Sequence, residues 1–304
     1  MIVKILLSTY NGEKYLEEQL SSLANQKYKD IRIRIRDDGS KDRTRDILEQ
    51  FVKKFKLSSW YAGKNIGVIN SFFELLSEED ENECIAYYAF CDQDDIWKPE
   101  KIERAVEIIK KHDPNTPIMY CSSYELLDSR SGKLLNKKKA TPRPSLKNAL
   151  VENIATGCSI VLNKAARDLI IVQKPRYTVM HDAWCYLVIS ALGTVIYDPF
   201  PSFYYRQHGT NVIGAEVNFF KKWEKRIDAF QKRKGIPLLT KQVQAFEEIF
   251  SDQLDNDKKK LINTFLSRNL ITRLLSIVKG NFYRQSHIDD LVFKILYLLS
   301  ASTS

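Results

Sequence analysis

The chain has 304 residues, 44% of them hydrophobic and 28% charged, with a formal net charge of +9. These values are typical of a globular protein with one large domain, or with one domain and an appendage. No stretch approaches the about 18 consecutive apolar residues of a membrane-spanning helix, so no transmembrane segment is expected. The apolar start, residues 1–8, predicts a first strand and not a secretory signal.

The charges and cysteines restrict the classes of partner and compartment. Positive charge is concentrated near the end, where residues 219–304 contain 16 Lys and Arg against 9 Asp and Glu. Such a region favours an anionic partner: nucleic acid, an anionic membrane or a phosphorylated substrate. The five cysteines form no CxxC pair and their number is odd. Buried reduced thiols in a cytosolic protein are therefore expected, and a zinc site is not.

The first third of the chain alternates strand patterns with helix patterns. Strand patterns cover residues 2–8, 31–36, 57–62 and 84–91, and apolar residues at helical spacing lie between them. This alternation predicts right-handed βαβ units and a mostly parallel sheet. Arg32, Arg34 and Arg36 make the second strand half polar, so one of its faces is expected to be partly open.

The pattern changes after a helix that begins at Pro99. We expect shorter strands near 117–127, 157–163, 194–198 and 202–207, and helices near 164–172 and 181–192. The lysine-rich connection from Ser129 to Ser145 is expected to be a mobile loop. Only helical patterns remain from about residue 216. We therefore predict an α/β domain with a mixed, mostly parallel sheet over residues 1–215 and a basic helical region over residues 216–304.

Four polar clusters follow directly after predicted strands. They are Ser8-Thr9-Tyr10-Asn11, Asp37-Asp38-Gly39-Ser40, the segment from Lys64 to Asn70, and Asp92-Gln93-Asp94-Asp95. Because parallel strands of one sheet all end on the same side, these clusters should converge in a single crevice.

The last cluster places three carboxylates in four residues. Their charges repel one another, so their proximity is explained best by a cation that bridges them. Hard oxygen ligands suit Mg²⁺ or Mn²⁺. A solvated acidic turn is the alternative that the tetrapeptide alone leaves open.

At this point the sequence resembles a known family, the family-2 inverting glycosyltransferases with the GT-A fold, and especially their bacterial rhamnosyltransferase-like branch. The likeness spans roughly residues 1–215. The residues that carry it are Ser8-Thr9-Tyr10-Asn11-Gly12, Arg36-Asp37-Asp38-Gly39-Ser40, Asp42-Arg43-Thr44, Asn65-Ile66-Gly67, Asp92-Gln93-Asp94-Asp95-Ile96-Trp97, Thr156-Gly157-Cys158, His181-Asp182-Ala183-Trp184 and Tyr205-Arg206-Gln207-His208-Gly209.

The resemblance implies a site for the nucleotide of a sugar donor. Tyr10 offers a ring for the base to stack on, and Asp38 accepts the N3–H of uracil or thymine, which disfavours cytosine. Taken alone, Tyr10 also fits a packing aromatic and Asp38 a turn residue before Gly39. The implied nucleotide-binding residues are Ser8, Thr9, Tyr10, Asn11, Asp37, Asp38, Asn70, Asp92, Gln93 and Arg206.

The resemblance also implies a divalent cofactor, Mn²⁺ or Mg²⁺. Asp94 is the expected principal ligand, Asp92 lies near the ribose and the metal, and His208 completes the metal or diphosphate site. Arg206 is expected to hold phosphate. A lone histidine is usually structural, so a structural His208 remains the alternative.

The expected general base is Asp182, which deprotonates the acceptor hydroxyl as that hydroxyl attacks the anomeric carbon. An N-cap aspartate for the following helix is the competing interpretation. The implied acceptor-binding residues are Thr156, Gly157, His181 and Trp184. Many relatives have two acidic residues or a second Trp in this motif, and this chain departs from them slightly.

The implied reaction is an inverting, metal-dependent transfer of a sugar, with L-rhamnose from dTDP-L-rhamnose as the expected donor. The acceptor is a hydroxyl of a glycan or lipid-linked glycan in bacterial cell-surface polysaccharide synthesis. The alternative donor is a UDP-sugar such as UDP-glucose, UDP-galactose or UDP-GlcNAc. A nucleotide-sugar-binding scaffold protein is the non-enzymatic alternative. No nucleic-acid partner is expected, because no recognised binding module is present.

The basic C-terminal region has aromatic and leucine stripes at helical spacing, which are typical of core or subunit contacts and predict a homodimer through these helices. An anionic membrane surface is the alternative partner, because basic residues flank the apolar positions. These are Lys221, Lys222, Lys225, Arg226, Lys232, Arg233 and Lys234. The expected location is cytoplasmic, peripheral at the inner face of the plasma membrane.

Overall fold

A computed structural model describes residues 1–79, 83–135, 141–207 and 235–301. These residues form two compact units. The first comprises Met1–Lys139, Ala155–Lys174 and Gly193–Asn211, and the second Ala140–Ile154, Pro175–Leu192 and Val212–Ser304. The predicted domain boundary at residues 215 and 216 and the basic stripe from Lys221 to Lys234 lie outside the described residues.

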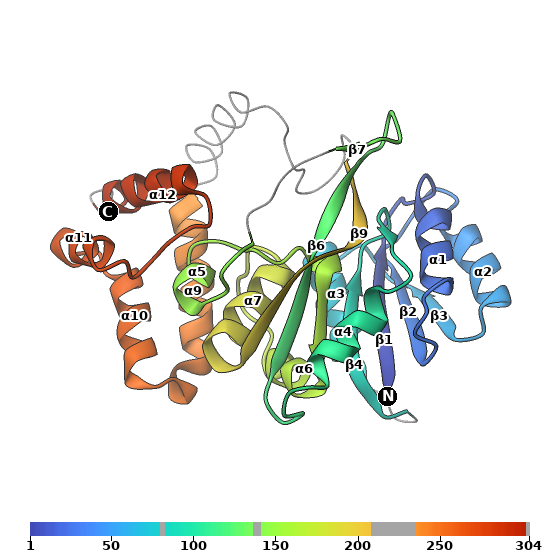
Figure 1. Cartoon of the computed structure of the whole chain (residues 1–304), viewed down its shortest axis with the longest axis horizontal. Helices are drawn as coiled ribbons and strands as arrows, with labels where there is room; N and C mark the ends of the chain where they lie inside the picture. The colour runs from blue at the N-terminus through green and yellow to red at the C-terminus, as the bar shows by residue number, and fades with distance from the viewer. Residues whose placement is uncertain (80–82, 136–140, 208–234, 302–304) are drawn as a thin grey trace. The chain divides into compact units, whose positions relative to one another are not determined.

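The first unit contains a nine-stranded sheet with the order β3-β2-β1-β4-β8-β6-β9-β5, and β7 pairs with β6 (Figure 1). Its strands are β1 (Ile2–Thr9), β2 (Ile31–Asp37), β3 (Ser58–Ala62), β4 (Ile85–Cys91), β5 (Ile96–Trp97), β6 (Ile118–Asp128), β7 (Leu134–Leu135), β8 (Ile160–Asn163) and β9 (Thr194–Gln207). Its helices are α1 (Leu16–Ala24), α2 (Thr44–Lys54), α3 (Val68–Ser77), α4 (Lys101–Ile109) and α6 (Lys164–Ile171).

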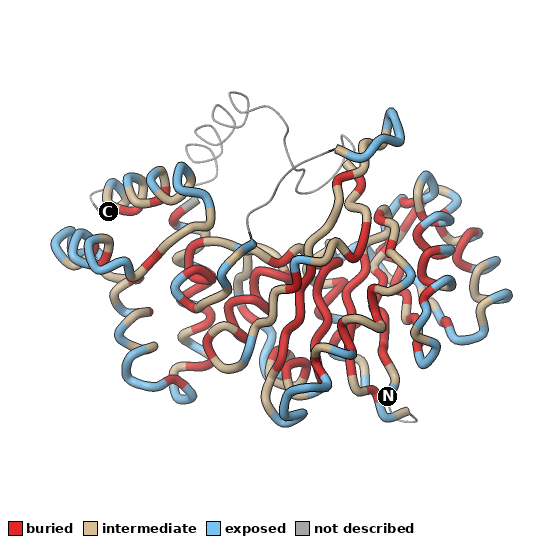
Figure 2. The backbone as a smooth tube through the Cα atoms, viewed as in Figure 1, coloured by how far each residue is buried: buried red, intermediate tan, exposed pale blue. Residues whose placement is uncertain are grey.

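The predicted fold class, a mixed α/β sheet flanked by helices with a helical C-terminal region, is confirmed. Strands β3, β2, β1 and β4 are parallel to one another, whereas β8 is antiparallel to both β4 and β6. Buried residues are concentrated along these strands (Figure 2).

The two strands expected over 194–198 and 202–207 form one long strand, β9. Its pairing with β6 shifts register between Asp198 and Pro201. Pro199 and Pro201 have no N–H to donate to a ladder, so the strand is irregular there without ending. Part of the expected loop from Ser129 to Ser145 forms the short strand β7, and residues 136–140 lie outside the description.

The arginines of β2 face carboxylates. Arg32 pairs with Glu83 at 2.6 Å and Arg34 with Glu78 at 2.7 Å, and both arginine side chains stay about a third exposed. Arg36 at the end of the strand is buried. The polar face is therefore partly open at the start of β2, as predicted, and closed at its end.

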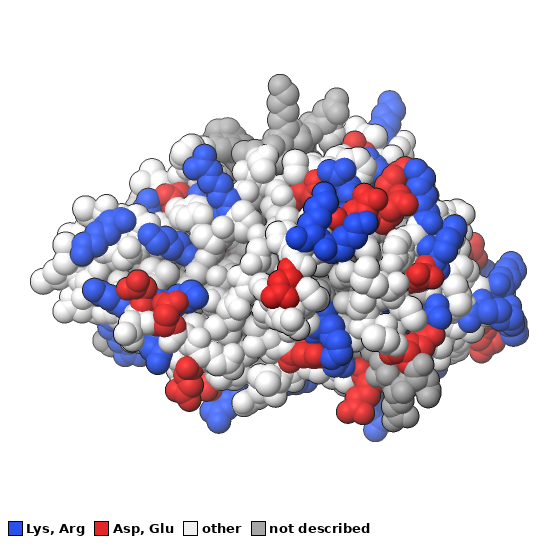
Figure 3. All heavy atoms as spheres, turned by 60° about the horizontal axis from the view of Figure 1, so that its bottom comes forward, with Lys and Arg blue, Asp and Glu red and all other residues white. Residues whose placement is uncertain are grey.

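Figure 3 shows one face of the molecule, on which acidic and basic side chains lie close together and no continuous basic surface forms. No helix in the described parts of the chain is long and apolar enough to cross a membrane.

The second unit is helical. It contains α5 (Leu146–Ala149), α7 (His181–Leu192), α9 (Gly235–Phe250), α10 (Asn256–Leu266), α11 (Leu270–Val278) and α12 (His287–Leu299). Most residues of α7 are buried. Trp184 has no exposed surface, and its ring centroid lies 6.3 Å from those of Phe246 and Phe250 in α9. Helix α9 also supplies Gln242, whose Oε1 accepts hydrogen bonds from Thr178 Oγ1 and Val179 N at 2.9 Å.

Asn163, which is buried, joins three segments of the first unit. Its Oδ1 accepts hydrogen bonds from Ala166 N, as the N-cap of α6, and from Ile118 N at the start of β6. Its Nδ2 donates to Thr116 O at 2.8 Å.

Asn163→Ala should lower the free energy of unfolding by about 2–4 kcal/mol, because it removes the cap and leaves buried backbone groups unbonded. Urea unfolding measures this loss. The exposed Asn263→Ala is the control and should change stability by less than about 0.5 kcal/mol. Equal stability of the two variants would contradict the assigned contacts.

Burial lowers the pKa of His181 to about 3. The unfolded chain takes up this proton near the ordinary histidine pKa of about 6.5, so the folded state binds fewer protons between pH 6.5 and 3. The stability contributed by neutral His181 is complete above pH 6.5 and decreases as the pH falls below it.

Wild-type protein should therefore lose about 1–2 kcal/mol more stability than His181→Gln between pH 7 and pH 5. Denaturant unfolding of both proteins at the two pH values measures the difference. If both lose the same stability, His181 is not neutral and buried as described.

Candidate active site

The carboxyl ends of the four parallel strands lie along one edge of the sheet. Thr9 is in register with Asp37, Asp37 with Ala62, and Leu7 with Cys91. The loops after these strands carry the polar clusters of the sequence, and hydrogen bonds join them to one another. The ends of β1, β2, β3 and β4 therefore form a single candidate site.

Asp38 is buried, with 3% of its surface exposed, and is held by two segments. Its Oδ1 accepts hydrogen bonds from Arg36 Nη1 at 2.5 Å and Ile66 N at 2.9 Å, and its Oδ2 accepts one from Gly67 N at 2.9 Å. A carboxylate oxygen accepts about two hydrogen bonds, so Oδ2 keeps capacity for another donor. This geometry suits a carboxylate that receives one further N–H.

The guanidinium of Arg36 holds the Asp38 carboxylate in place. It also donates to Glu74 Oε1 and Lys64 O, each at 3.0 Å. A Cβ on Gly63 would lie 2.4 Å from Arg36 Nη2, so only glycine lets the loop after β3 pass so close to the guanidinium.

Asp37 has no exposed surface, and both of its carboxylate oxygens accept hydrogen bonds from neighbouring residues. Its oxygens accept hydrogen bonds from Thr9 Oγ1 at 3.2 Å, Ser40 N at 3.0 Å and Arg45 Nε at 2.9 Å. These bonds tie the end of β1 to the loop after β2. In this structure Asp37 and Thr9 are buried and shape the loop.

Tyr10 is 44% exposed, and its backbone is clamped by Gln93. Tyr10 N donates to Gln93 Oε1 at 2.8 Å, and Gln93 Nε2 donates to Tyr10 O at 3.1 Å. A Cβ on Gly12 would lie 2.3 Å from Gln93 Oε1, so glycine makes room for the clamp. The aromatic ring is accessible while its backbone is fixed.

Asn11 has a φ of 47°, a left-handed conformation that asparagine tolerates better than most residues. It joins the first loop to the second: Asn11 N donates to Ser40 Oγ, and Lys41 N donates to Asn11 Oδ1, both at 2.9 Å. Gly12 N continues the contact by donating to Thr44 Oγ1 at 2.8 Å.

Two further predicted nucleotide-binding residues hold the loop after β3 and the start of α3. Ser8 Oγ lies 2.7 Å from Ser71 Oγ, and Asn70 Nδ2 donates to Ile66 O at 2.8 Å. Both residues lie on the same edge as Asp38.

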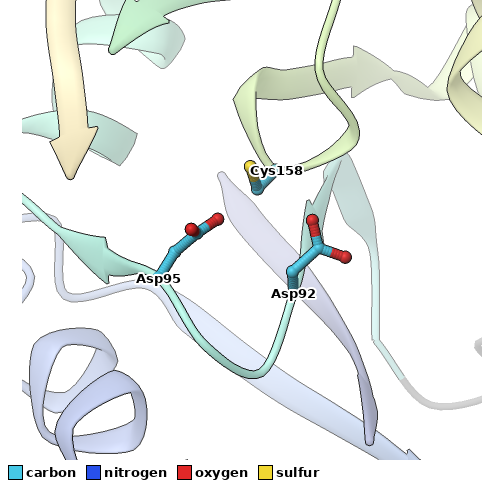
Figure 4. Close-up of side chains that lie close together, drawn as sticks. All are labelled: Asp92, Asp95 and Cys158. Atoms are coloured by element: carbon cyan, nitrogen blue, oxygen red, sulfur yellow. The ribbon is translucent and has the colours of Figure 1, made fainter. Parts of the chain in front are cut away.

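Two carboxylates of the acidic loop and the thiol of Cys158 form a group of possible metal ligands. Asp92, Asp95 and Cys158 each offer one ligand atom, and these three atoms lie within 4.8 Å of one another. Figure 4 shows the three side chains turned toward each other. Asp95 is 1% exposed, whereas Asp92 and Asp94 are half-buried. Burial, with the charges of Asp94 and Asp92, raises the pKa of Asp95 well above its usual range.

The donor set fits a hard divalent ion better than a soft one. Burial, with the charges of Asp95 and Asp92, raises the pKa of the Cys158 thiol, which favours the protonated form over the thiolate that binds soft metals. The carboxylates then remain as ligands. The sequence predicted a cation at the cluster that contains Asp92 and Asp95, but it did not predict Cys158. The expected principal ligand, Asp94, is not among these three grouped side chains.

Arg206 from β9 holds the acidic loop in place. Arg206 Nε donates to Asp94 O at 2.9 Å, and its backbone N donates to Asp95 Oδ1 at 3.2 Å. Its guanidinium pairs with Glu18 and lies 4.7 Å from the centre of the Tyr15 ring. Arg206 therefore contacts the acidic loop and Glu18 of helix α1.

The remaining predicted residues are distributed over both units. Thr156 and Gly157 belong to the first unit, where Thr156 O accepts a hydrogen bond from Ser159 N at 2.8 Å. His181, Asp182 and Trp184 belong to α7 of the second unit. Asp182 is 7% exposed, and its Oδ1 accepts a hydrogen bond from Ala183 N at 2.6 Å. His208 lies outside the described residues.

Known proteins are similar to this chain in sequence or in fold. The family model "Glycosyl transferase family 2" matches residues 4–170. A protein named dTDP-rhamnosyl transferase RfbG of Shigella flexneri is 32% identical over 232 residues, which cover 72% of this chain and 77% of that protein.

Two solved structures have a similar fold. Staphylococcus aureus TarS 1-349 in complex with UDP-GlcNAc matches with a TM-score of 0.56 and 14% identity, over 98% of this chain and 90% of that one. Mannosyltransferase PcManGT from Pyrobaculum calidifontis, in complex with GDP-Man and Mn²⁺, matches with a TM-score of 0.50 and 14% identity, over 99% of this chain and 85% of that one. By the extent of the family match and the identity to its relative, this chain belongs to glycosyl transferase family 2.

Proposed function

We propose that this protein is an inverting, metal-dependent glycosyltransferase that transfers L-rhamnose from dTDP-L-rhamnose to a hydroxyl of a glycan or lipid-linked glycan in bacterial cell-surface polysaccharide synthesis. One observation carries this proposal: the strand ends gather an exposed aromatic ring, a buried carboxylate with one acceptor position left, and an acidic loop. These are the groups that a pyrimidine and a metal-bound diphosphate require. The name of the Shigella flexneri relative supports the rhamnosyl donor.

The base is recognised by Tyr10 and Asp38. The ring of Tyr10 stacks on it, and Asp38 Oδ2 accepts its N3–H. Cytosine has an acceptor at N3, so the carboxylate repels it. Uracil and thymine present the same N3–H, so a UDP-sugar such as UDP-glucose, UDP-galactose or UDP-GlcNAc is the alternative donor. The TarS complex contains UDP-GlcNAc, so this donor should be included in the tests.

The cofactor is Mn²⁺ or Mg²⁺, held by Asp94 and Asp92, with His208 as a further ligand. Asp94 is the proposed principal ligand; Asp94 and Asp92 are both half-buried, whereas Asp95 is almost inaccessible. A bound divalent ion neutralises the charge that develops on the leaving diphosphate. The Mn²⁺ in the PcManGT complex supports testing manganese first.

The remaining steps use the chain's own residues. Asp182 takes the proton of the acceptor hydroxyl. Thr156, Gly157, His181 and Trp184 contribute to the acceptor side, His181 and Trp184 from buried positions. The enzyme works at the cytoplasmic face of the plasma membrane, where a lipid-linked acceptor is available, and its C-terminal helices contact an anionic membrane or a second subunit.

A donor panel tests the proposal. Purified protein is incubated with dTDP- and UDP-sugars, in Mn²⁺, Mg²⁺ or EDTA, and released nucleoside diphosphate is quantified. dTDP-L-rhamnose should be consumed fastest, and EDTA should abolish the reaction. Faster consumption of a UDP-sugar selects the alternative donor. Binding of a donor with no turnover, even with cell-surface glycan added, would indicate a non-enzymatic scaffold.

Tyr10→Ala should weaken dTDP or UDP binding about tenfold, since stacking of a base on an aromatic ring contributes about 1–3 kcal/mol. Tyr10→Phe keeps the ring and should bind within about twofold of wild type. Titration calorimetry with manganese measures both. Because the ring is exposed, the melting temperature should not change, and wild-type affinity in Tyr10→Ala would place the base elsewhere.

Asp182→Asn should lower kcat by about 10²–10⁴-fold, the usual contribution of a general base, while the Kd for nucleotide stays near that of wild type. Asp182→Glu retains a carboxylate and should keep part of the activity. Steady-state rates and calorimetry on the same preparations separate the two effects. Full activity in Asp182→Asn would remove Asp182 from the mechanism.

A further inference from the structure

Helix α11 turns its apolar residues outward and its polar residues inward. Of its nine residues, the buried ones are Arg273 and Ser276. Its exposed residues include five large apolar side chains: Leu270 (56%), Ile271 (68%), Leu274 (51%), Leu275 (51%) and Val278 (77%). An amphipathic helix on a protein surface normally has the opposite orientation.

Arg273 fixes this orientation through contacts within the second unit. Its Nε donates to Ser267 O at 2.6 Å, and its Nη1 donates to Tyr297 O at 2.5 Å and Ser300 Oγ at 2.7 Å. Its guanidinium lies 4.5 Å from the centre of the Tyr297 ring. A buried, hydrogen-bonded arginine cannot turn toward water without leaving these acceptors unbonded, so the apolar face of α11 stays outside.

Helix α12 adds a second outward apolar row. Ile288, Leu291, Ile295 and Leu299 are 46–60% exposed and lie at helical spacing. The opposite side of α12 is packed, since Phe293 and Tyr297 stack at 5.5 Å and Tyr297 stacks on Phe265 at 5.7 Å. Exposed apolar surface on this scale usually marks an interaction site.

The charged residues around α11 are all basic, whereas α12 carries Asp289 and Asp290 in its first turn, where Asp290 pairs with Lys294. No Asp or Glu occurs between Asp257 and Asp289, whereas Lys258, Lys259, Lys260, Arg268, Lys279 and Arg284 fall in that stretch. Arg268 lies two residues before α11 and Lys279 follows it directly, and both residues are exposed. If two copies of α11 paired face to face in antiparallel fashion, these like charges would meet. An anionic surface would attract them instead.

We infer that the outward face of α11 and α12, bordered by Arg268 and Lys279, inserts into the interfacial layer of an anionic lipid bilayer. The apolar side chains enter the boundary of the acyl chains while the two basic side chains contact lipid phosphates. This inference deepens the membrane placement proposed above by naming the contact face, and it does not depend on the donor or the reaction.

Full-length protein is mixed with vesicles of phosphatidylcholine and phosphatidylglycerol (7:3) or of phosphatidylcholine alone, and bound protein is measured by flotation. Wild type should float with the anionic vesicles and much less with the neutral ones. Ile271→Gln/Val278→Gln should weaken binding about tenfold or more, because two apolar side chains that enter the bilayer are lost. Arg268→Gln/Lys279→Gln should reduce binding mainly at low salt.

The matched control is Leu134→Gln/Val172→Gln, which removes two exposed apolar side chains from the first unit and should bind as wild type. Circular dichroism spectra and melting temperatures test whether the variants are folded. Donor turnover, measured on the same preparations, distinguishes loss of membrane binding from loss of activity. Wild-type flotation of Ile271→Gln/Val278→Gln would overturn the inference. Light scattering gives a second contradicting outcome. If wild type is a dimer and Ile271→Gln/Val278→Gln is a monomer with unchanged flotation, the face is a subunit interface.

Discussion

The candidate site depends on how the acidic loops at the carboxyl edge of the sheet are neutralised. Carboxylates gathered at one edge repel one another, and burial makes that repulsion stronger. Arginines lie at both acidic loops. Arg45 bonds Asp37 and Arg36 bonds Asp38 in the loop after β2, and Arg206 bonds the backbone of the Asp92–Asp95 loop. These contacts hold the loops together without an added ligand, so the edge is largely built before a nucleotide arrives.

The same contacts separate framework from binding surface. Asp37 has no exposed surface and its carboxylate is used by the loop, whereas Tyr10 is exposed and Asp38 keeps one acceptor position. Gln93, Gly12 and Gly63 serve the framework, since their geometry allows the loops to approach so closely. A pyrimidine nucleotide would therefore meet a fixed ring and a fixed carboxylate, which reduces the ordering cost of binding.

Sequence patterns predicted the elements of the first unit because each short apolar run and each helical stripe has a local signature, and the clusters after the strands followed from parallel pairing. Side-chain partners distant in sequence could not be predicted. Nothing local indicates that Gln93 clamps Tyr10, that Arg206 holds Asp94, or that Cys158 lies beside Asp95. The sequence patterns indicated two strands over 194–198 and 202–207, whereas the structure has one strand, β9, whose register shift accommodates its two prolines. The stripe of α11 indicated a helix, but only the contacts of Arg273 show that its apolar side faces out.

Whether this edge binds nucleotide and metal together can be measured most directly in crystals grown with dTDP and Mn²⁺, using anomalous scattering to locate manganese. The account predicts an anomalous peak bonded to a carboxylate of the Asp92–Asp95 loop and to the diphosphate, with thymine stacked on Tyr10 and its N3 next to Asp38. A nucleotide bound away from this edge, or manganese without a carboxylate of this loop, would contradict it.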